Sequence, residues 1–262
     1  MRRIMDPLSN KKYDRNEFSQ CVEHFSFTKA IFKIVSPEGK FLDEDKLREF
    51  EKFEVLLQDA TCVLYPELEK KDEKKVAKRG IYRVFSGLRF FTYVLLDATR
   101  LESNIRKTTF EGFVNSVIYV GKGCGERPLS HMKDAKSTQN NRKQHYLAGL
   151  NVEGMGVIVA DGGDRYSYCH EAFVREDCMM QLYPKTFLLN GVSGHTSKFD
   201  EYAEWASEYQ QVLVGDAIQI DESTKYEFGI YCLWRKYQAF LVEKNPIIRF
   251  ENCECKYKKR SK

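Results

Sequence analysis

The sequence lacks the marks of a membrane or secreted protein. It has no run of about 18 apolar residues that would span a bilayer. Its start, Met1-Arg2-Arg3, is not followed by the apolar segment of a secretory signal. Its eight cysteines include no C-x-x-C pair, and Cys253 and Cys255 have no second cluster at zinc-site spacing. We therefore expect a reduced, intracellular protein, nuclear, cytoplasmic or both, without a membrane partner.

The composition lacks a strong bias as well. With 42% apolar residues, the 262-residue chain can bury a core in one large domain or two smaller ones. The net charge is +4, and residues 256–262 carry five basic side chains, so the rest of the chain sums to about −1. That tail suits nuclear import or phosphate contact, and equally a solvated terminus. A second basic stretch, residues 121–149, has six Lys or Arg against two acids and suits contact with phosphates.

The N-terminal part, residues 1–80, is predicted to be a mixed α/β region of unknown role. Its pattern indicates a strand at 27–35, a turn at 36–39 and a helix at 43–59 whose apolar residues recur at helical spacing. Residues 70–79 are rich in charge and are either a linker or an exposed helical turn. This charged segment is the predicted boundary between the N-terminal region and the next domain.

Residues 88–196 alternate short apolar segments with helical patterns, which predicts an α+β domain. The second strand is expected to stop at Gly121-Lys122-Gly123. The expected strands cover residues 91–96, 116–120 and 156–160, and the expected helices cover residues 109–114, 128–136, 142–151 and 168–182. Residues 197–262 are predicted to be a helical extension with the basic tail. In it Tyr202, Trp205 and Tyr209 form a stripe interpreted as a core face.

The predicted strands and helices of residues 88–196 carry a set of polar residues in a characteristic order. Tyr93 lies on the first strand, Tyr119-x-Gly121 on the second, and Arg127 comes eight residues after Tyr119. His131 lies one helical turn beyond Arg127, so both point from one face. Glu176 on the last helix and then Asn190 complete the set. This order resembles the GIY-YIG nuclease family.

The resemblance is closest to the metazoan branch that carries ankyrin repeats and a LEM domain beside the nuclease, neither of which is found here. The long spacer between Tyr93 and Tyr119 supports that branch, and the resemblance covers roughly residues 88–196. The segments that carry it are FTYVLLD at 91–97, YVGKG at 119–123, Arg127-Pro128 and A-x-x-RE at 172–176. Literal Gly-Ile-Tyr strings at 80–82 and 229–231 lack a partner downstream, so we interpret Tyr93 as the motif tyrosine.

The resemblance implies a small central antiparallel sheet of about three strands flanked by helices, and an endonuclease that hydrolyses DNA. The chemistry of the residues fits. Glu176 would hold one Mg²⁺ (or Mn²⁺) ion, and Arg127 would donate to the scissile phosphate. Tyr93 and Tyr119 together would act as base, and Lys122 would favour the phenolate. His131 would orient water or a tyrosine hydroxyl, and Asn190 would hold the geometry.

Each of these residues alone has a plainer explanation, such as strand packing for a tyrosine or solvation for a lysine, and their joint order favours the nuclease. The substrate-binding groups are predicted to be Gly121, Lys122, Arg127, Lys133, Lys136, Arg142 and Lys143, which would contact the DNA backbone. Members of the branch act on branched or distorted DNA, so flaps and junctions are the expected substrates in repair or chromosome processing. The alternatives are an inactive nucleic-acid-binding module and a scaffold. The oligomeric state is left open.

Overall fold

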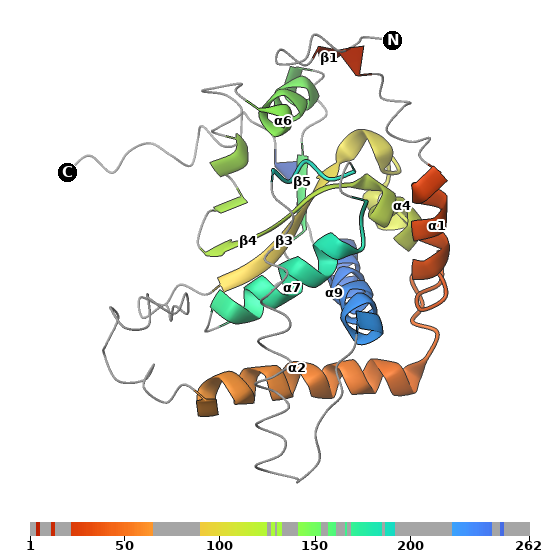
Figure 1. Cartoon of the computed structure of the whole chain (residues 1–262). Coiled ribbons are helices and arrows are strands. Elements are labelled where there is room, and N and C mark those ends of the chain that lie inside the picture. Colours follow the sequence, from red (N-terminus) through yellow and green to blue (C-terminus); the bar gives the residue numbers. More distant parts are fainter. Residues whose placement is uncertain are drawn as a thin grey trace, which may run out of the picture.

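A four-stranded antiparallel sheet forms the centre of the molecule (Figure 1). The computed structural model describes residues 4–5, 12–13, 22–64, 90–124, 127–128, 130–132, 141–152, 157–160, 166, 169–184, 187–191, 222–242 and 247–248. The strand order is β4-β3-β5-β6. The strands are β3 (Phe90–Asp97), β4 (Val117–Cys124), β5 (Val157–Ala160) and β6 (Ile247–Ile248), and a separate pair is formed by β1 (Ile4–Met5) and β2 (Lys12–Tyr13).

The predicted α+β class is confirmed, whereas the sheet has four strands among the described residues rather than about three. The strands expected at 91–96, 116–120 and 156–160 correspond to β3, β4 and β5. The fourth strand, β6, is only two residues long, too short for an alternating pattern to reveal it.

Strand β3 is buried on both faces, and its alternation divides the core in two. Val94 and Leu96 face a large cluster that includes side chains of α7 and α9. Phe91, Tyr93 and Leu95 face a smaller cluster that includes Leu147 and Leu150 of α6. Successive strand side chains point to opposite faces, so α6 lies across the sheet from α7 and α9 (Figure 1).

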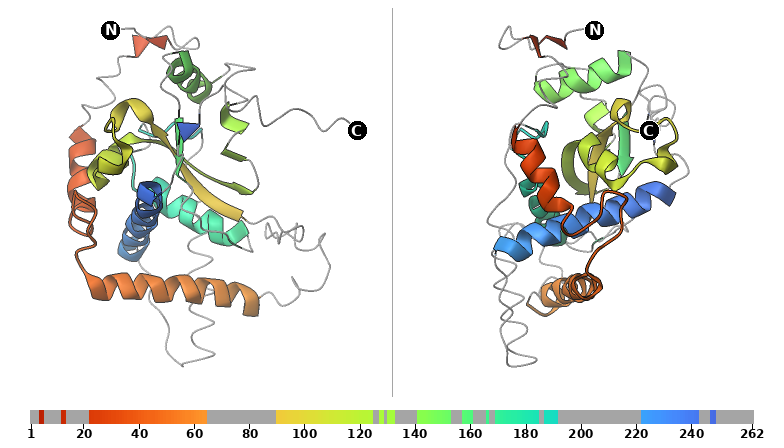
Figure 2. Two further views of the ribbon diagram at one scale, coloured as in Figure 1. Left: turned by 180° about the vertical axis from the view of Figure 1, so that it is seen from behind. Right: turned by 90° about the vertical axis from the view of Figure 1, so that its right-hand side faces the viewer.

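The helices build these layers. Helix α2 lies beyond α7 and α9 on the side away from the sheet (Figure 2). The α-helices are α1 (Val22–Ile31), α2 (Glu44–Leu64), α4 (Phe110–Ser116), α6 (Arg142–Val152), α7 (Cys169–Gln181) and α9 (Glu222–Val242). Two 3₁₀ turns, η2 (Ala98–Arg100) and η3 (Ile105–Lys107), join β3 to α4. Among the described residues, none of these helices has the length and apolar character needed to cross a bilayer.

Most predicted helices are confirmed, and the predicted N-terminal strand is wrong. Residues 27–31 belong to α1 instead of a strand, and Phe27 and Ile31, four residues apart, are both buried. That spacing is helical, and the run of aromatic and β-branched residues concealed it. The turn at 36–39 is confirmed, because the Ser36 carbonyl accepts a hydrogen bond from the Gly39 N–H. The aromatic stripe at 202–209 and residues 70–82 lie outside the described residues.

The predicted stop of the second strand at Gly121-Lys122-Gly123 is also wrong. Strand β4 continues through both glycines to Cys124. Glycine inside a strand often marks a place where another group approaches the backbone closely. Here the rings of Tyr93 and Tyr119 approach Gly121, and the Arg127 side chain approaches Gly123.

A polar contact ties α2 to the helices that cover the sheet. The Arg175 guanidinium of α7 donates to the Glu54 carboxylate of α2 at 3.2 and 3.3 Å, and the Tyr231 hydroxyl of α9 donates to the same carboxylate at 2.9 Å. Arg175 also stacks on the Tyr166 ring, 4.3 Å from its centroid. Tyr231 belongs to the second Gly-Ile-Tyr string, which therefore has a packing role within α9. The N-terminal region is thus joined to the core through a buried cation.

We expect the substitution Glu54→Ala to lower the free energy of unfolding by about 2–4 kcal/mol, because it leaves the buried Arg175 without its carboxylate. Asp45→Ala is the matched control. Asp45 also pairs with an arginine, Arg48, at 3.1 Å, but both side chains are exposed. We expect its loss to cost less than about 1 kcal/mol. Urea unfolding of the three proteins measures the difference, and equal losses for the two variants would contradict the role of Glu54.

Candidate active site

Two tyrosines lie together on the face of the sheet that α6 covers. In the register of β3 with β4, Tyr93 is opposite Gly121 and Leu95 is opposite Tyr119, so the tyrosines are diagonal neighbours. Their ring centroids are 6.2 Å apart. A Cβ atom at Gly121 would lie 2.6 Å from ring carbons of both tyrosines. The Tyr-x-Gly motif is therefore a packing requirement, since any side chain at Gly121 would displace the pair.

His131 joins the two tyrosines. Its Nε2 lies 2.6 Å from the Tyr93 hydroxyl, and its ring and that of Tyr119 meet edge to face with centroids 4.7 Å apart. On the other side of the imidazole, the Lys143 Nζ lies 3.1 Å from Nδ1. The same ammonium lies 4.8 Å from the Tyr119 ring centroid. Tyr93, Tyr119, His131 and Lys143 thus form one contiguous cluster, which we call the tyrosine–histidine cluster.

Burial controls the protonation of this cluster. Burial raises the pKa of Tyr93 and of Tyr119 above the ordinary value, and the Glu176 carboxylate raises both further. Burial, together with the Lys143 and Arg127 charges, lowers the pKa of His131 to about 3. At neutral pH the tyrosines are therefore protonated and the imidazole is uncharged.

Arg127 lies at the edge of the cluster with its side chain exposed. Its stem packs over Gly123, where a Cβ atom would come within 2.4 Å of the Arg127 Cβ and Cγ. Its Nη1 donates to the Ser130 hydroxyl at 3.1 Å. The guanidinium lowers the pKa of both tyrosines and so opposes the effect of burial. The sequence assigns that effect to Lys122; in the structure it comes from Arg127.

Lys122 is paired with Glu176. Its ammonium donates to the Glu176 carboxylate and lies 3.8 Å from the centroid of the Phe173 ring. Burial raises the pKa of Glu176, and the Lys122 charge opposes that shift. The neighbouring carboxylate, Asp177, lies 3.5 Å from the Lys225 Nζ of α9. Glu176 is therefore the carboxylate of α7 that is directed at β4.

Asn190 binds the outer edge of β4. Its amide oxygen accepts from the Val120 N–H at 3.1 Å, and its amide nitrogen donates to the Val120 carbonyl at 2.7 Å. The Leu189 N–H donates to the Ile118 carbonyl at 2.7 Å. Because β4 is the edge strand of the described sheet, these backbone groups face away from β3 and its ladder. Asn190 thus fixes the backbone of the residue between Tyr119 and Gly121.

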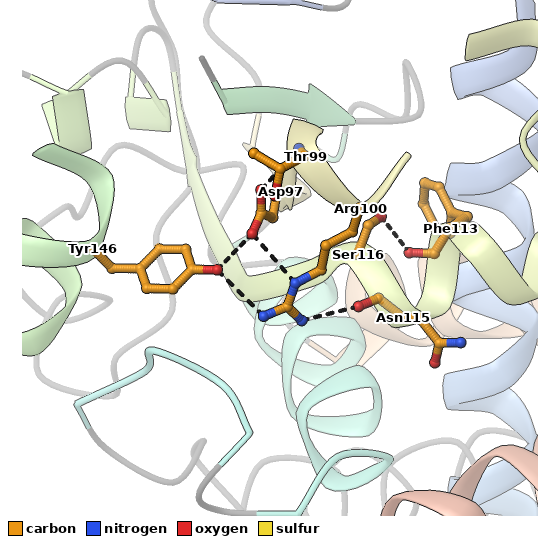
Figure 3. A network of polar contacts seen from close by, with 7 residues as sticks. All are labelled: Asp97, Thr99, Arg100, Phe113, Asn115, Ser116 and Tyr146. Carbon is orange, nitrogen blue, oxygen red and sulfur yellow. Dashed lines mark hydrogen bonds and ion pairs between the residues drawn. The ribbon is translucent and has the colours of Figure 1, made fainter. Parts of the chain in front are cut away.

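A second polar network holds α6 against the sheet (Figure 3). The Tyr146 hydroxyl donates to the buried Asp97 carboxylate at 2.5 Å. Arg100 Nε lies 3.3 Å from the same carboxylate, and Arg100 also donates to the Asn115 carbonyl at 3.2 Å. Tyr146 lies one helical turn after Lys143, so the network also places Lys143.

The structure brings most of the predicted site residues together. Arg142 is exposed at the start of α6, and Lys133 and Lys136 lie outside the described residues. Sequence reasoning missed two partners, Ser130 beside Arg127 and Phe173 beneath Lys122. Each lies three residues from a predicted site residue on a helical segment, so helical spacing was the available signal.

Comparison with known proteins defines the family. Residues 90–254 match the LEM-3-like GIY-YIG domain, which is more than half of the chain, so the chain belongs to this nuclease family. It is similar to the ankyrin repeat and LEM domain-containing protein 1 homolog of Caenorhabditis elegans, with 27% identity over 173 residues. It is also similar to ankyrin repeat and LEM domain-containing protein 1 of Mus musculus, with 25% identity over 183 residues.

Each match covers 63% of this chain but only 22% and 30% of those two proteins, respectively. No solved structure matches the chain. The resemblance to the ankyrin-repeat and LEM-domain branch is confirmed. The matched segment runs through α9, and the division of the chain at residue 196 stays a prediction.

The low pKa of His131 predicts a pH dependence of stability. The folded pKa of about 3 lies below the ordinary 6.5, so the unfolded chain binds the proton more readily. This contribution to stability is complete above about pH 6.5 and is lost as the pH falls, by up to about 1.4 kcal/mol per pH unit. We expect the free energy of unfolding to fall more steeply for wild type than for His131→Gln between about pH 6.5 and 4.5. Parallel curves in urea unfolding would contradict a buried neutral imidazole.

Proposed function

We propose that the chain is a metal-dependent endonuclease that hydrolyses DNA phosphodiester bonds and selects branched or distorted DNA. The observation that carries the proposal is the tyrosine–histidine cluster beside an exposed Arg127 and a buried Glu176. The Glu176 carboxylate raises the pKa of both tyrosines, so these groups act on one another within one site. Membership of a nuclease family supports the reaction class.

The donor set fits one hard divalent cation, Mg²⁺ or Mn²⁺, at Glu176. The described residues include no group of three or more His, Cys, Asp or Glu side chains that could hold a metal. A single carboxylate suits Mg²⁺, which usually keeps several waters and takes phosphate oxygens from the substrate. When bound, such an ion supplies a Lewis acid that stabilises the developing charge on the phosphate and the leaving oxygen. Lys122 competes for the same carboxylate.

The side chains of the site suit the remaining tasks. The exposed guanidinium of Arg127, whose Nη1 donates to Ser130, would donate in a fork to the scissile phosphate. The tyrosine pair would receive the proton of the attacking water. Because burial disfavours a phenolate, the tyrosine that receives this proton would pass its own proton on through the hydroxyl of the other tyrosine. Asn190 keeps Tyr119 and Gly121 in register by holding the backbone between them.

The kind of DNA that the protein would bind depends on the groups that surround the site. Arg127 and Arg142 are exposed cations that suit phosphates, and phosphate contacts carry no base sequence. Selection would then depend on the shape of the DNA. We propose flaps, junctions and bulges as substrates, in repair or chromosome processing.

The first test is cleavage of a panel of duplex, flap and four-way-junction DNA with Mg²⁺ or Mn²⁺. We expect the branched substrates to be cut, and Glu176→Gln to reduce the rate by about a hundredfold or more, since the metal contribution is several kcal/mol. Tyr93→Phe and Tyr119→Phe should lose about a hundredfold or more as well.

Glu111→Gln is the matched control, because Glu111 is an exposed carboxylate on α4 outside the site. It should cleave as wild type does. An uncut panel would show that the chain is a binding module or a scaffold on a nuclease fold, and full activity of Glu176→Gln would show that Glu176 does not hold the metal.

Metal binding is tested separately by titrating the protein with Mn²⁺ and following the free ion by electron paramagnetic resonance. Wild type should bind one ion and Glu176→Gln should bind none. Lys122→Met should bind about tenfold more tightly, equivalent to ~1.4 kcal/mol, because the competing ammonium is gone. Weaker binding by Lys122→Met would mean that the lysine supports the metal site instead of competing with it.

A further inference from the structure

Lys143 meets the imidazole of His131 on the side opposite Tyr93. The Lys143 Nζ is 3.1 Å from Nδ1, and the Tyr93 hydroxyl is 2.6 Å from Nε2. The Tyr93 contact lies in the interior, since His131 is 1% exposed and Tyr93 is fully buried, and the Lys143 contact is partly buried. The two ring nitrogens are thus committed to two different partners.

The chemistry of these partners determines where the imidazole proton lies. An ammonium has only donors, so Nδ1 has to be the acceptor and carries no proton. A neutral imidazole then carries its proton on Nε2, which donates to the Tyr93 oxygen. An imidazolium is excluded by the same contact, because both of its nitrogens would be donors. The low pKa of His131 agrees with the neutral form.

The tautomer decides what Tyr93 can do. With the proton on Nε2, the Tyr93 oxygen is an acceptor and its own hydrogen is directed away from His131. A phenolate at Tyr93 would keep this N–H donor and would be stabilised by it. With the proton on Nδ1, the Tyr93 hydroxyl would donate to Nε2 and its oxygen would lose that donor. The first arrangement alone leaves Tyr93 ready to exchange a proton with Tyr119 or with a substrate water.

The fold holds Lys143 in position from both sides. Asn141 caps the first turn of α6, where its side chain accepts from the Gln144 N–H at 3.0 Å. One turn beyond Lys143, the Tyr146 hydroxyl is bound to Asp97 (Figure 3). The ammonium itself lies against the Tyr119 ring, 4.8 Å from its centroid. These contacts fix the Lys143 side chain, unlike that of a flexible surface lysine that contacts phosphates.

We infer that Lys143 is a positioning residue, which holds His131 in the Nε2–H tautomer so that Tyr93 accepts a hydrogen bond from the imidazole. Its importance for cleavage rests on the proposed nuclease function, whereas its effect on the tautomer does not. The inference also replaces the predicted role of Lys143 as a phosphate contact.

The test is nitrogen-15 NMR of the His131 ring in protein labelled with ¹⁵N, at neutral pH and without DNA. The chemical shifts of the two nitrogens distinguish the tautomers, and His131→Gln assigns the signals. We expect the Nε2–H form in wild type and in Lys143→Arg, which keeps a cationic donor. Lys143→Met should populate the Nδ1–H form. An Nδ1–H histidine in wild type, or a tautomer unchanged in Lys143→Met, would overturn the inference.

Cleavage kinetics on a branched DNA give the second measurement. Removing the partner that orients a metal-bound histidine costs about 10- to 100-fold in activity. By analogy, we expect Lys143→Met to lose about as much in kcat, with KM unchanged. Lys143→Arg should recover most of the rate, and Lys107→Met, which removes an exposed lysine of η3, should leave it unaltered. If Lys143→Met raises KM alone and lowers the salt dependence of binding, Lys143 contacts a DNA phosphate instead, and the inference is wrong. If wild type cuts no DNA but the tautomer responds to Lys143, the nuclease proposal fails and this one stands.

Discussion

The site depends on the close packing of two tyrosine rings against strand β4 at a glycine, where the strand has no side chain. Tyr93 and Tyr119 both lie over Gly121, which requires the register that places Tyr93 opposite that glycine. The register shifts between Leu95 and Leu96, and this irregularity lets Val117 and Val120 enter one cluster while Ile118 enters the other. A slip of one residue in a strand moves each of its side chains to the opposite face. Packing of the core and assembly of the site are therefore one requirement.

The elements that the sequence predicts well are those whose periodicity is decided by the core. Strand β3 and helix α7 match their apolar patterns closely. The failures have local causes. Aromatic and β-branched residues give helix α1 the composition of a strand, although Phe27 and Ile31 are spaced as on a helix. The glycines of strand β4 resemble a turn, whereas they admit the tyrosine rings and the stem of Arg127.

The order of the predicted site residues in the sequence indicated a common site, and the structure brings most of them together, but their pairing could not be predicted. The sequence predicts that both lysines, Lys122 and Lys143, contact the DNA backbone and that Lys122 also favours a tyrosine phenolate. In the folded chain one is bound to Glu176 and the other to His131. These partners lie 54 and 12 residues away along the sequence, and no local pattern links them. What a cation does in a buried site is set by the nearest acceptor, and that is a property of the tertiary structure.

The contact of Asn190 with Val120 has a consequence for how the protein comes to be functional. It closes a loop of 70 residues and occupies backbone groups that an edge strand would otherwise offer to any other extended chain. A contact so distant in sequence costs loop-closure entropy, and it can form only after both of its residues have been synthesised. A nascent or truncated polypeptide that ends before Asn190 would therefore carry both tyrosines without holding them in working order.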